Sequence, residues 1–180
     1  MPLKRSFPLF TERLEIRGLE SKDVTEDYIA GLNNIEYMRY SLQSLKVHTI
    51  SSQLDYIKAF AESDDKILAI VLREQQRLVG TFTLRPQDLG KGVDLGIFIF
   101  PECSGNRFAN EAWSALVHHL SRQFLWISGG CAKSNLPMIS IMESANMTVE
   151  REVKNSISLF HGLEDGIFYR FDSASKESRV

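Results

Sequence analysis

The stretch PECSGNRFANEAW, residues 101–113, lies between an apolar run at residues 93–100 and a helical pattern. The run predicts a buried strand, and the spacing of apolar residues predicts a helix over about residues 106–123. A chain that enters a helix through Ser104–Asn106 leaves the first backbone amides of that helix without partners inside it. An ordinary turn and a cradle for an anion both fit this pattern. The rest of the sequence has to decide between them.

Hydrophobic periodicity on both sides predicts the order strand, two helices, three strands, helix, strand, helix and final strands. This order is typical of a mixed α/β domain. The expected segments are a strand at 14–17, helices in 19–34 and 47–65, strands at 66–72, 75–85 and 93–100, a helix at 106–123, a strand at 124–132, a helix at 135–145 and strands in 147–171.

Local signals add detail to three of these segments. Gly129 and Gly130 are expected to break the strand at 124–132. Turns are expected at residues 154–155 and 161–166, within the final strands. The second helix is expected to bury one apolar face, made of Ile50, Leu54, Ile57 and Ala61.

The size and composition of the chain suit a single domain over residues 1–180, since 43% of its 180 residues are hydrophobic. Residues 173–180 have the composition of a flexible tail. A net charge of −2 and a pI near 6.1 argue against a protein that wraps nucleic acid. The sequence has no apolar run long enough for a membrane span, and its beginning lacks the apolar block of a secretory signal. Cys103 and Cys131 form neither a disulfide framework nor a metal site, so a cytoplasmic protein with reduced thiols is expected.

Three motifs in order resemble the GNAT superfamily of acyl-CoA-dependent N-acetyltransferases, and within it the ribosomal-protein-alanine acetyltransferase branch. FTERLEIRGLESKDV at residues 10–24 resembles the opening TERLxLRxxxxxDa of that branch. VDLGIFIFPECSGNRFANEAW at 93–113 resembles its aeIGyxixPxxxGkGyAxEA, and GGCAKSNLPMISIMESANM at 129–147 resembles its axxxxxNxxSxxxxeKxGF. The resemblance extends from about Thr11 to Phe171. It implies the single-domain fold of this family, with a mostly antiparallel sheet, flanking helices and a cofactor cleft in the middle of the sheet.

The resemblance also implies acetyl-CoA as the acyl donor, with its pyrophosphate held by the amides of the turn. The backbone at Phe98, Ile99 and Phe100 would hold the pantetheine arm. Arg107 stands where the family has its second glycine, so the cradle is expected to survive if Arg107 keeps ordinary helical backbone angles. Its guanidinium would bring a charge to a phosphate. By position, the cradle would consist of Ser104, Gly105, Asn106, Arg107, Phe108, Ala109 and Asn110.

Two further positions carry a role in the family and have a plain structural alternative. Asp94 stands where the family often has Glu, and a carboxylate there would take a proton from the amine, directly or through water. A strand-end Asp in water or paired with Arg explains this residue equally well. Asn135 matches an Asn that touches or supports the pantetheine arm, and Asn is also a preferred helix cap, so both roles can hold together.

The proton donor that the family often places on its last helix is missing here. Met138 and Met142 occupy the positions of the family's Ser and Tyr, and neither can donate a proton. Both are expected to pack against the sheet or against the acyl arm. Water would then protonate the leaving thiolate.

The acceptor side of the cleft is expected near the first two helices. His48 has an imidazole that titrates near neutrality, so it could bind an acceptor or act as a base. A polar residue beside a helix cap is the favoured interpretation of His48. Tyr37, Arg39 and Tyr40 would offer aromatic faces and one cation to an acceptor, or pack as a connector between helices.

These observations predict an enzyme that moves an acetyl group from acetyl-CoA to a primary amine by direct attack. The acceptor is expected to be a small amine, such as an amino sugar on a nucleotide, or a protein N-terminus. The alternative is a non-catalytic acyl-CoA-binding module that has lost the usual proton donor. No metal, nucleic acid or membrane partner is expected. Exposed strand edges near the C-terminus are compatible with a homodimer.

Overall fold

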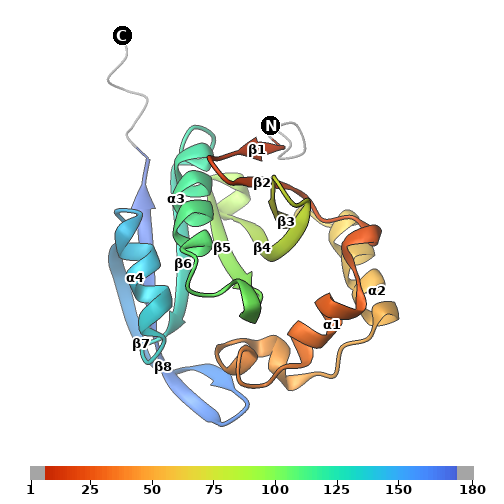
Figure 1. The fold of residues 1–180 in the computed structure, drawn as a ribbon. Helices are drawn as coiled ribbons and strands as arrows, with labels where there is room; N and C mark the ends of the chain where they lie inside the picture. Colours follow the sequence, from red (N-terminus) through yellow and green to blue (C-terminus); the bar gives the residue numbers. More distant parts are fainter. Residues whose placement is uncertain (1–6, 174–180) are drawn as a thin grey trace.

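A single sheet of eight strands organises the protein, and the computed structural model describes residues 7–173 of the chain (Figure 1). The order of the strands is β1-β2-β3-β4-β5-β6-β8-β7. This confirms the mixed α/β class and the predicted order of elements. The strands are β1 Leu9–Phe10, β2 Leu14–Gly18, β3 Lys66–Leu72, β4 Arg77–Gln87, β5 Gly92–Ile99, β6 Trp126–Ala132, β7 Thr148–Leu159 and β8 Gly162–Asp172. The helices are α1 Glu26–Asn33, α2 Ile50–Ala61, α3 Phe108–Leu120 and α4 Leu136–Ser144.

The sheet is antiparallel except where β5 pairs with β6 in parallel. That parallel pairing begins at Gly92 and ends where Leu95 lies opposite Gly129. Beyond this point β5 continues along β4 only, and β6 continues along β8 only. The two strands therefore part in the middle of the sheet, and within residues 7–173 no strand pairs with the β6-facing edge of β5 over residues 96–99. An unpaired edge inside a sheet leaves backbone groups that a bound extended molecule can satisfy.

Helices cover the two faces of the sheet from opposite sides. On one face, α3 buries Trp113 so close to β6 that a Cβ added to Gly129 would lie 2.9 Å from the indole ring. On the other face, Gly31 of α1 lies against Phe100. A Cβ added to Gly31 would lie 2.7 Å from the Phe100 ring. Side chains alternate along a strand, so Asp94 of β5 points to the face that α1 covers.

The helix predicted over residues 19–34 is divided in the structure. A 3-10 turn, η2 (Ser21–Asp23), comes first, and α1 begins only at Glu26 after the cap Thr25. The side chain of Thr25 accepts a hydrogen bond from the amide of Tyr28 at 3.2 Å. Asp23 reaches back to the amide of Glu20 at 2.8 Å, and this local bond stabilises the separate turn.

The buried face predicted for α2 is partly wrong. Ile50 and Ile57 pack against the core, but Leu54 and Ala61 are exposed. Gln53 and Phe60 are buried instead, at 5% and 8% exposure. A polar side chain such as Gln53 tolerates burial because its amide group is hydrogen-bonded, here to Tyr28 and His48.

Two of the breaks predicted near the C-terminus do not occur, and the turn expected at residues 161–166 comes slightly earlier. β6 runs unbroken through Gly129 and Gly130, which lie against the rings of Trp113 and Phe168. Glycine there makes room for aromatic side chains instead of ending the strand. β7 passes the turn expected at residues 154–155 as a bulge, with φ of 50° at Asn155, and the hairpin turns at residues 160–161.

The remaining predictions on chain ends and partners are only partly covered by the structure. Residues 174–180 of the expected tail lie outside the described part of the chain. Across residues 7–173, no helix combines the length and apolar character that crossing a membrane requires. β7 lies at the edge of the sheet and is exposed along most of its length, and the homodimer stays a prediction.

Candidate active site

The chain from Pro101 forms a 3-10 turn, η6 (Pro101–Cys103), followed by a left-handed bend into α3. Gly105 has a φ of 79°, and a Cβ added there would meet nothing within 4 Å. The side-chain amide of Asn106 donates to the carbonyls of Cys103 and Ser104, each at 3.2 Å. These bonds hold the bend in shape and leave an open surface in front of it.

Unpaired amides line this bend. Within residues 7–173, the backbone amides of residues 105 to 110 donate to no protein acceptor, whereas the amide of Glu111 donates to the carbonyl of Arg107. Unpaired amides at the start of a helix carry partial positive charge and favour anions. The geometry therefore favours the anion cradle over a plain turn.

The backbone of Arg107 differs from the expectation. Its φ is 60° and its ψ is 18°, so it lies in the left-handed region and not in an ordinary helical conformation. The bend requires this conformation, which glycine adopts freely and which costs an arginine about 1–2 kcal/mol. The chain thus keeps the backbone path of a glycine while it carries a guanidinium.

A network that sequence reasoning missed ties the cradle to the beginning of the chain. One oxygen of Glu111, in the first turn of α3, accepts bonds from the hydroxyl of Thr11 at 2.5 Å and from the amide of Arg13 at 2.9 Å. The other oxygen accepts from Nε of Arg13 at 2.7 Å. Burial alone would raise the pKa of Glu111, but the bonds from Thr11 and Arg13 outweigh it and hold the pKa below its ordinary value. The resemblance motifs contained all three residues, and no local pattern showed that they meet.

Asp94 lies on β5 just before β5 and β6 part. Its Oδ1 accepts a hydrogen bond from the hydroxyl of Ser128 on β6 at 2.8 Å. Burial raises the pKa of Asp94 above its ordinary value, while the bond from Ser128 and the charges of Arg85 and Arg151 oppose that rise. A half-buried carboxylate with a raised pKa, at the opening between two strands, is suited to accept a proton.

The residues predicted on α4 divide between a cap and the core. Asn135 caps the helix, since its Oδ1 accepts from the amide of Met138 at 3.2 Å. Met142 is fully buried at 0% exposure, so its predicted contact with a cofactor is wrong and its packing against the sheet is confirmed. Met138 is half-buried against the same core, and a cofactor contact of its side chain stays a prediction.

His48 has a structural position. It is only 4% exposed, its Nε2 lies 2.8 Å from the carbonyl of Gln43, and its Nδ1 lies 2.8 Å from the amide nitrogen of Gln53. Both ring nitrogens are therefore engaged, and neither is left for an acceptor. This geometry agrees with the favoured interpretation of His48 as a polar residue beside a helix cap. We assign His48 no part in the chemistry.

An open hollow of about 680 Å³ lies between residues 35–40, the β6–α4 turn and the tip of the β7–β8 hairpin. Arg39 and Tyr40 line it, with the guanidinium 4.9 Å from the centre of the Tyr40 ring, and their contact with an acceptor stays a prediction. The hydroxyl of Tyr40 donates to the carbonyl of Ser134 at 3.1 Å. Tyr37 is half exposed and is not part of the lining. The lining consists of Ile35, Glu36, Arg39, Tyr40, Ser134, Phe160, His161 and Glu164.

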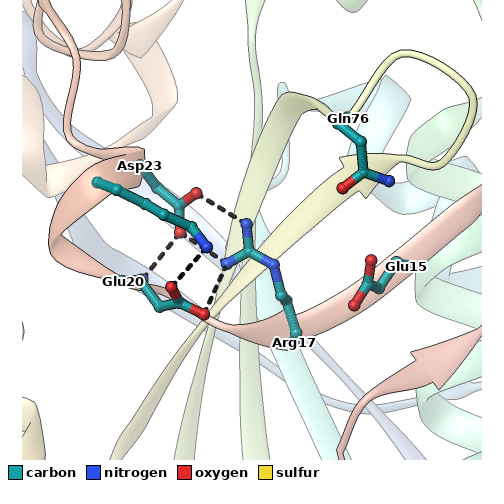
Figure 2. Close-up of a pocket in the computed structure, with 6 residues that line it drawn as sticks. Glu15, Arg17, Glu20, Asp23 and Gln76 are labelled. Carbon is teal, nitrogen blue, oxygen red and sulfur yellow. Dashed lines mark hydrogen bonds and ion pairs between the residues drawn. The ribbon is translucent and has the colours of Figure 1, made fainter.

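A second hollow, of about 560 Å³, lies beside β2 and η2 and is shown in Figure 2. The guanidinium of Arg17 binds both oxygens of Asp23, at 2.7 and 2.8 Å. Glu20 lies against the same guanidinium at 3.8 Å and against Lys22 at 2.8 Å. Because these four charges pair with one another, we interpret them as a structural ion-pair cluster, and Glu15 and Gln76 complete the lining of the hollow. Over residues 7–173, no group of side chains has the composition of a metal site.

Comparison with known proteins agrees with this geometry. Residues 13–148 match the family described as "Acetyltransferase (GNAT) domain". The chain belongs to this family. No curated protein sequence gives a match. The match confirms the predicted resemblance and the expected acetyl-CoA-dependent N-acetyltransferase.

Solved structures share the fold at low sequence identity. A GNAT-family acetyltransferase from Bacillus anthracis has a TM-score of 0.81 at 21% identity, covering 92% of this chain and 98% of that chain. A spermidine N-acetyltransferase from Vibrio cholerae, in complex with CoA and spermine, has a TM-score of 0.79 at 15% identity, with 91% and 97% covered. A ribosomal-protein-S5-alanine acetyltransferase from Vibrio fischeri has a TM-score of 0.76 at 12% identity, with 93% and 97% covered. The last of these carries the name of the branch that the sequence motifs resemble.

Proposed function

We propose that this enzyme binds acetyl-CoA in the opening between β5 and β6 and transfers the acetyl group directly to a primary amine. The observation that carries the proposal is the row of unpaired amides at residues 105–110, next to a strand edge without a partner. The amides would bind the pyrophosphate of the donor. The backbone at Phe98 to Phe100, where β5 ends, would bind the pantetheine arm as a further strand would.

In this proposal Asp94 is the general base. An amine is mostly protonated at neutral pH and must lose a proton before it attacks the thioester carbonyl. Burial keeps the pKa of Asp94 above that of an exposed carboxyl, which brings it nearer to the working pH. The nitrogen then forms a bond to the acyl carbon and the carbon–sulfur bond breaks. Water protonates the leaving thiolate and takes up the second proton that the nitrogen loses as the amide forms. Met138 and Met142 supply no acid for that last step.

The hollow beside Tyr40 is the proposed acceptor site. Its volume of about 680 Å³ suits a small molecule. The rings of Tyr40 and Phe160 can stack on a flat group, and Arg39 can bind a phosphate. An amino sugar linked to a nucleotide combines these features, so we infer this class of acceptor before a protein N-terminus. The buried, unbridged thiols of Cys103 and Cys131 favour work in the cytoplasm.

A calorimetric titration of acetyl-CoA and of free CoA tests the donor site. Gly105→Trp is expected to abolish binding, because the indole would fill the open space in front of the amides. Gly90→Trp is the matched control, since Gly90 has a similar φ of 84° and equally open surroundings in the β4–β5 turn. Equal loss in both variants, or no binding by the wild type, would overturn the donor site.

Release of free CoA thiol in the presence of different amines tests the acceptor. We expect faster release with nucleotide-linked amino sugars than with spermidine or with peptides that begin with alanine or serine. Arg39→Gln should raise the KM of the sugar nucleotide and leave the KM of acetyl-CoA unchanged. If the peptides were acetylated faster than the sugar nucleotides, a protein N-terminus would be the acceptor instead of a nucleotide-linked amino sugar.

A further inference from the structure

Residues 11–13 lie at the edge of the sheet, yet their polar groups converge on the first turn of α3. The carboxylate of Glu111 receives three hydrogen bonds from this segment, two of them from Arg13. Thr11 and Arg13 are separated from Glu111 by 100 and 98 positions in the sequence. The bonds join two parts of the fold that share no pairing of strands.

Arg13 also contacts the cradle itself. Its Nη1 donates to the carbonyl of Asn106 at 3.1 Å. Its guanidinium carbon lies 4.6 Å from the centre of the Phe108 ring. Asn106 and Phe108 stand on either side of Arg107, the left-handed residue of the bend. One guanidinium therefore holds the carbonyl before the bend, the ring after it and the carboxylate one turn into the helix.

These contacts act where the backbone most needs support. The bend forces Arg107 into a conformation that opposes its own preference, so a relaxed chain would turn the amides of residues 105–110 away from a common direction. A planar guanidinium with several fixed donors can hold such a bend, whereas a lysine offers a single point of charge. Binding groups must be held within a fraction of an ångström to act together.

We propose that Arg13 is a positioning residue for the donor site: through Glu111, Asn106 and Phe108 it holds the cradle amides in the orientation that binds the phosphates of the acyl donor. The inference rests on the proposed donor site. It adds that the affinity for the donor depends on a residue from the beginning of the chain. Arg13 itself need not touch the donor or the reacting atoms.

Variants of Arg13 test this role by separating donor affinity from stability. Arg13→Gln should raise the KM of acetyl-CoA and the Kd of free CoA on the order of tenfold, with kcat and the KM of the acceptor changed little. Arg13→Lys should restore only part of that affinity, because lysine cannot make the fork of contacts. Arg17→Gln is the matched control. Arg17 lies on β2, its guanidinium binds the carboxylate of Asp23, and it makes no described contact with residues 105–110.

The outcomes are distinct. Equal melting temperatures for the Arg13 and Arg17 variants, with weaker CoA binding only in the first, support the positioning role. Unchanged CoA binding in Arg13→Gln would overturn it. If Gly105→Trp still abolished CoA binding in that case, the proposed donor site would stand without the positioning role of Arg13. If neither Gly105→Trp nor Arg13→Gln weakened CoA binding, both the donor site and the positioning role would be overturned. A cycle of Arg13→Gln, Glu111→Gln and the double variant should show that the two losses of affinity do not add.

Discussion

Two arginines near the beginning of the chain each bind a carboxylate at short distance, and their surroundings give them different roles. Arg13 binds Glu111 at 2.7 Å, and Arg17 binds Asp23 at 2.7 Å. In each pair the carboxylate also accepts a backbone amide, and its pKa lies below the ordinary value. Both carboxylates are therefore stabilised in their charged form, although Arg17 reaches both oxygens of Asp23 and the side chain of Arg13 reaches one oxygen of Glu111.

The difference lies in what each carboxylate belongs to. Asp23 belongs to η2, a local turn only six residues from its arginine, and Figure 2 shows Arg17 bound to Asp23 and Glu20 within the hollow beside β2. Glu111 belongs to the first turn of α3, directly after the unpaired amides of the cradle. An ion pair thus stabilises the fold in one place, and in the other it also shapes a binding surface.

The largest effect is expected from a carboxylate that belongs to neither pair. Asp94→Asn should lower kcat by about 10²-fold or more, because the amide cannot take the proton of the amine. The Kd of CoA should stay the same, since Asp94 lies outside the cradle. Acetyl transfer slowed to this extent, with unchanged CoA binding in calorimetry, would separate the chemical step from donor binding. Full activity in this variant would remove Asp94 from the mechanism.

The pair in Figure 2 should affect stability alone. Asp23→Ala leaves the partly buried guanidinium of Arg17 without its partner, so the free energy of unfolding should fall by about 1–3 kcal/mol. Urea denaturation measures that loss, and CoA titration of the folded variant should give the wild-type affinity. A weaker affinity for CoA would break the contrast between the two pairs.

The strain in the cradle can be released at one residue. Arg107→Gly should raise the free energy of unfolding by about 1 kcal/mol, because glycine adopts the left-handed conformation that Arg107 now holds. Arg107→Ala, which keeps a Cβ, serves as the control and should bring no such gain. A gain of the same size in Arg107→Ala would place the strain in the side chain and not in the backbone.

The smallest effect concerns the acidity of Asp94. The hydroxyl of Ser128 donates to the charged carboxylate and so lowers the pKa of Asp94 from the value that burial alone would give. Ser128→Ala should therefore raise that pKa further. Since the base works only when deprotonated, the acid limb of the pH profile of kcat/KM should move to higher pH. A limb that stays in place would show that another group sets it.

The sequence predicts elements whose patterns are local and misses features that depend on distant partners. The helix predicted over about residues 106–123 is confirmed as α3, in which Trp113, Leu116 and Leu120 repeat at helical spacing and are all buried. The buried face of α2 was mispredicted, since a hydrogen-bonded Gln53 takes the place of Leu54. No local pattern tells that an aromatic ring will need the space of Gly129.

The same limit applies to the candidate site. The amides of the bend could be expected from the glycine turn and the following helix, because helix ends always leave amides unpaired. The left-handed angles of Arg107 and the contact of Arg13 with Glu111 arise only when the sheet is assembled. His48 shows the reverse case, in which a residue of functional type is used for structure.

The central claim is that the amides of residues 105–110 bind the phosphates of the donor. Amide nitrogen–proton spectra of the 20.5 kDa protein, recorded while free CoA is added, test it most directly. The account predicts that the amide signals of residues 105–110 shift more than any others, towards the positions of strongly hydrogen-bonded amides. If the signals of residues 105–110 stayed unchanged while those of other residues shifted, CoA would bind elsewhere on the protein, and the account would be contradicted.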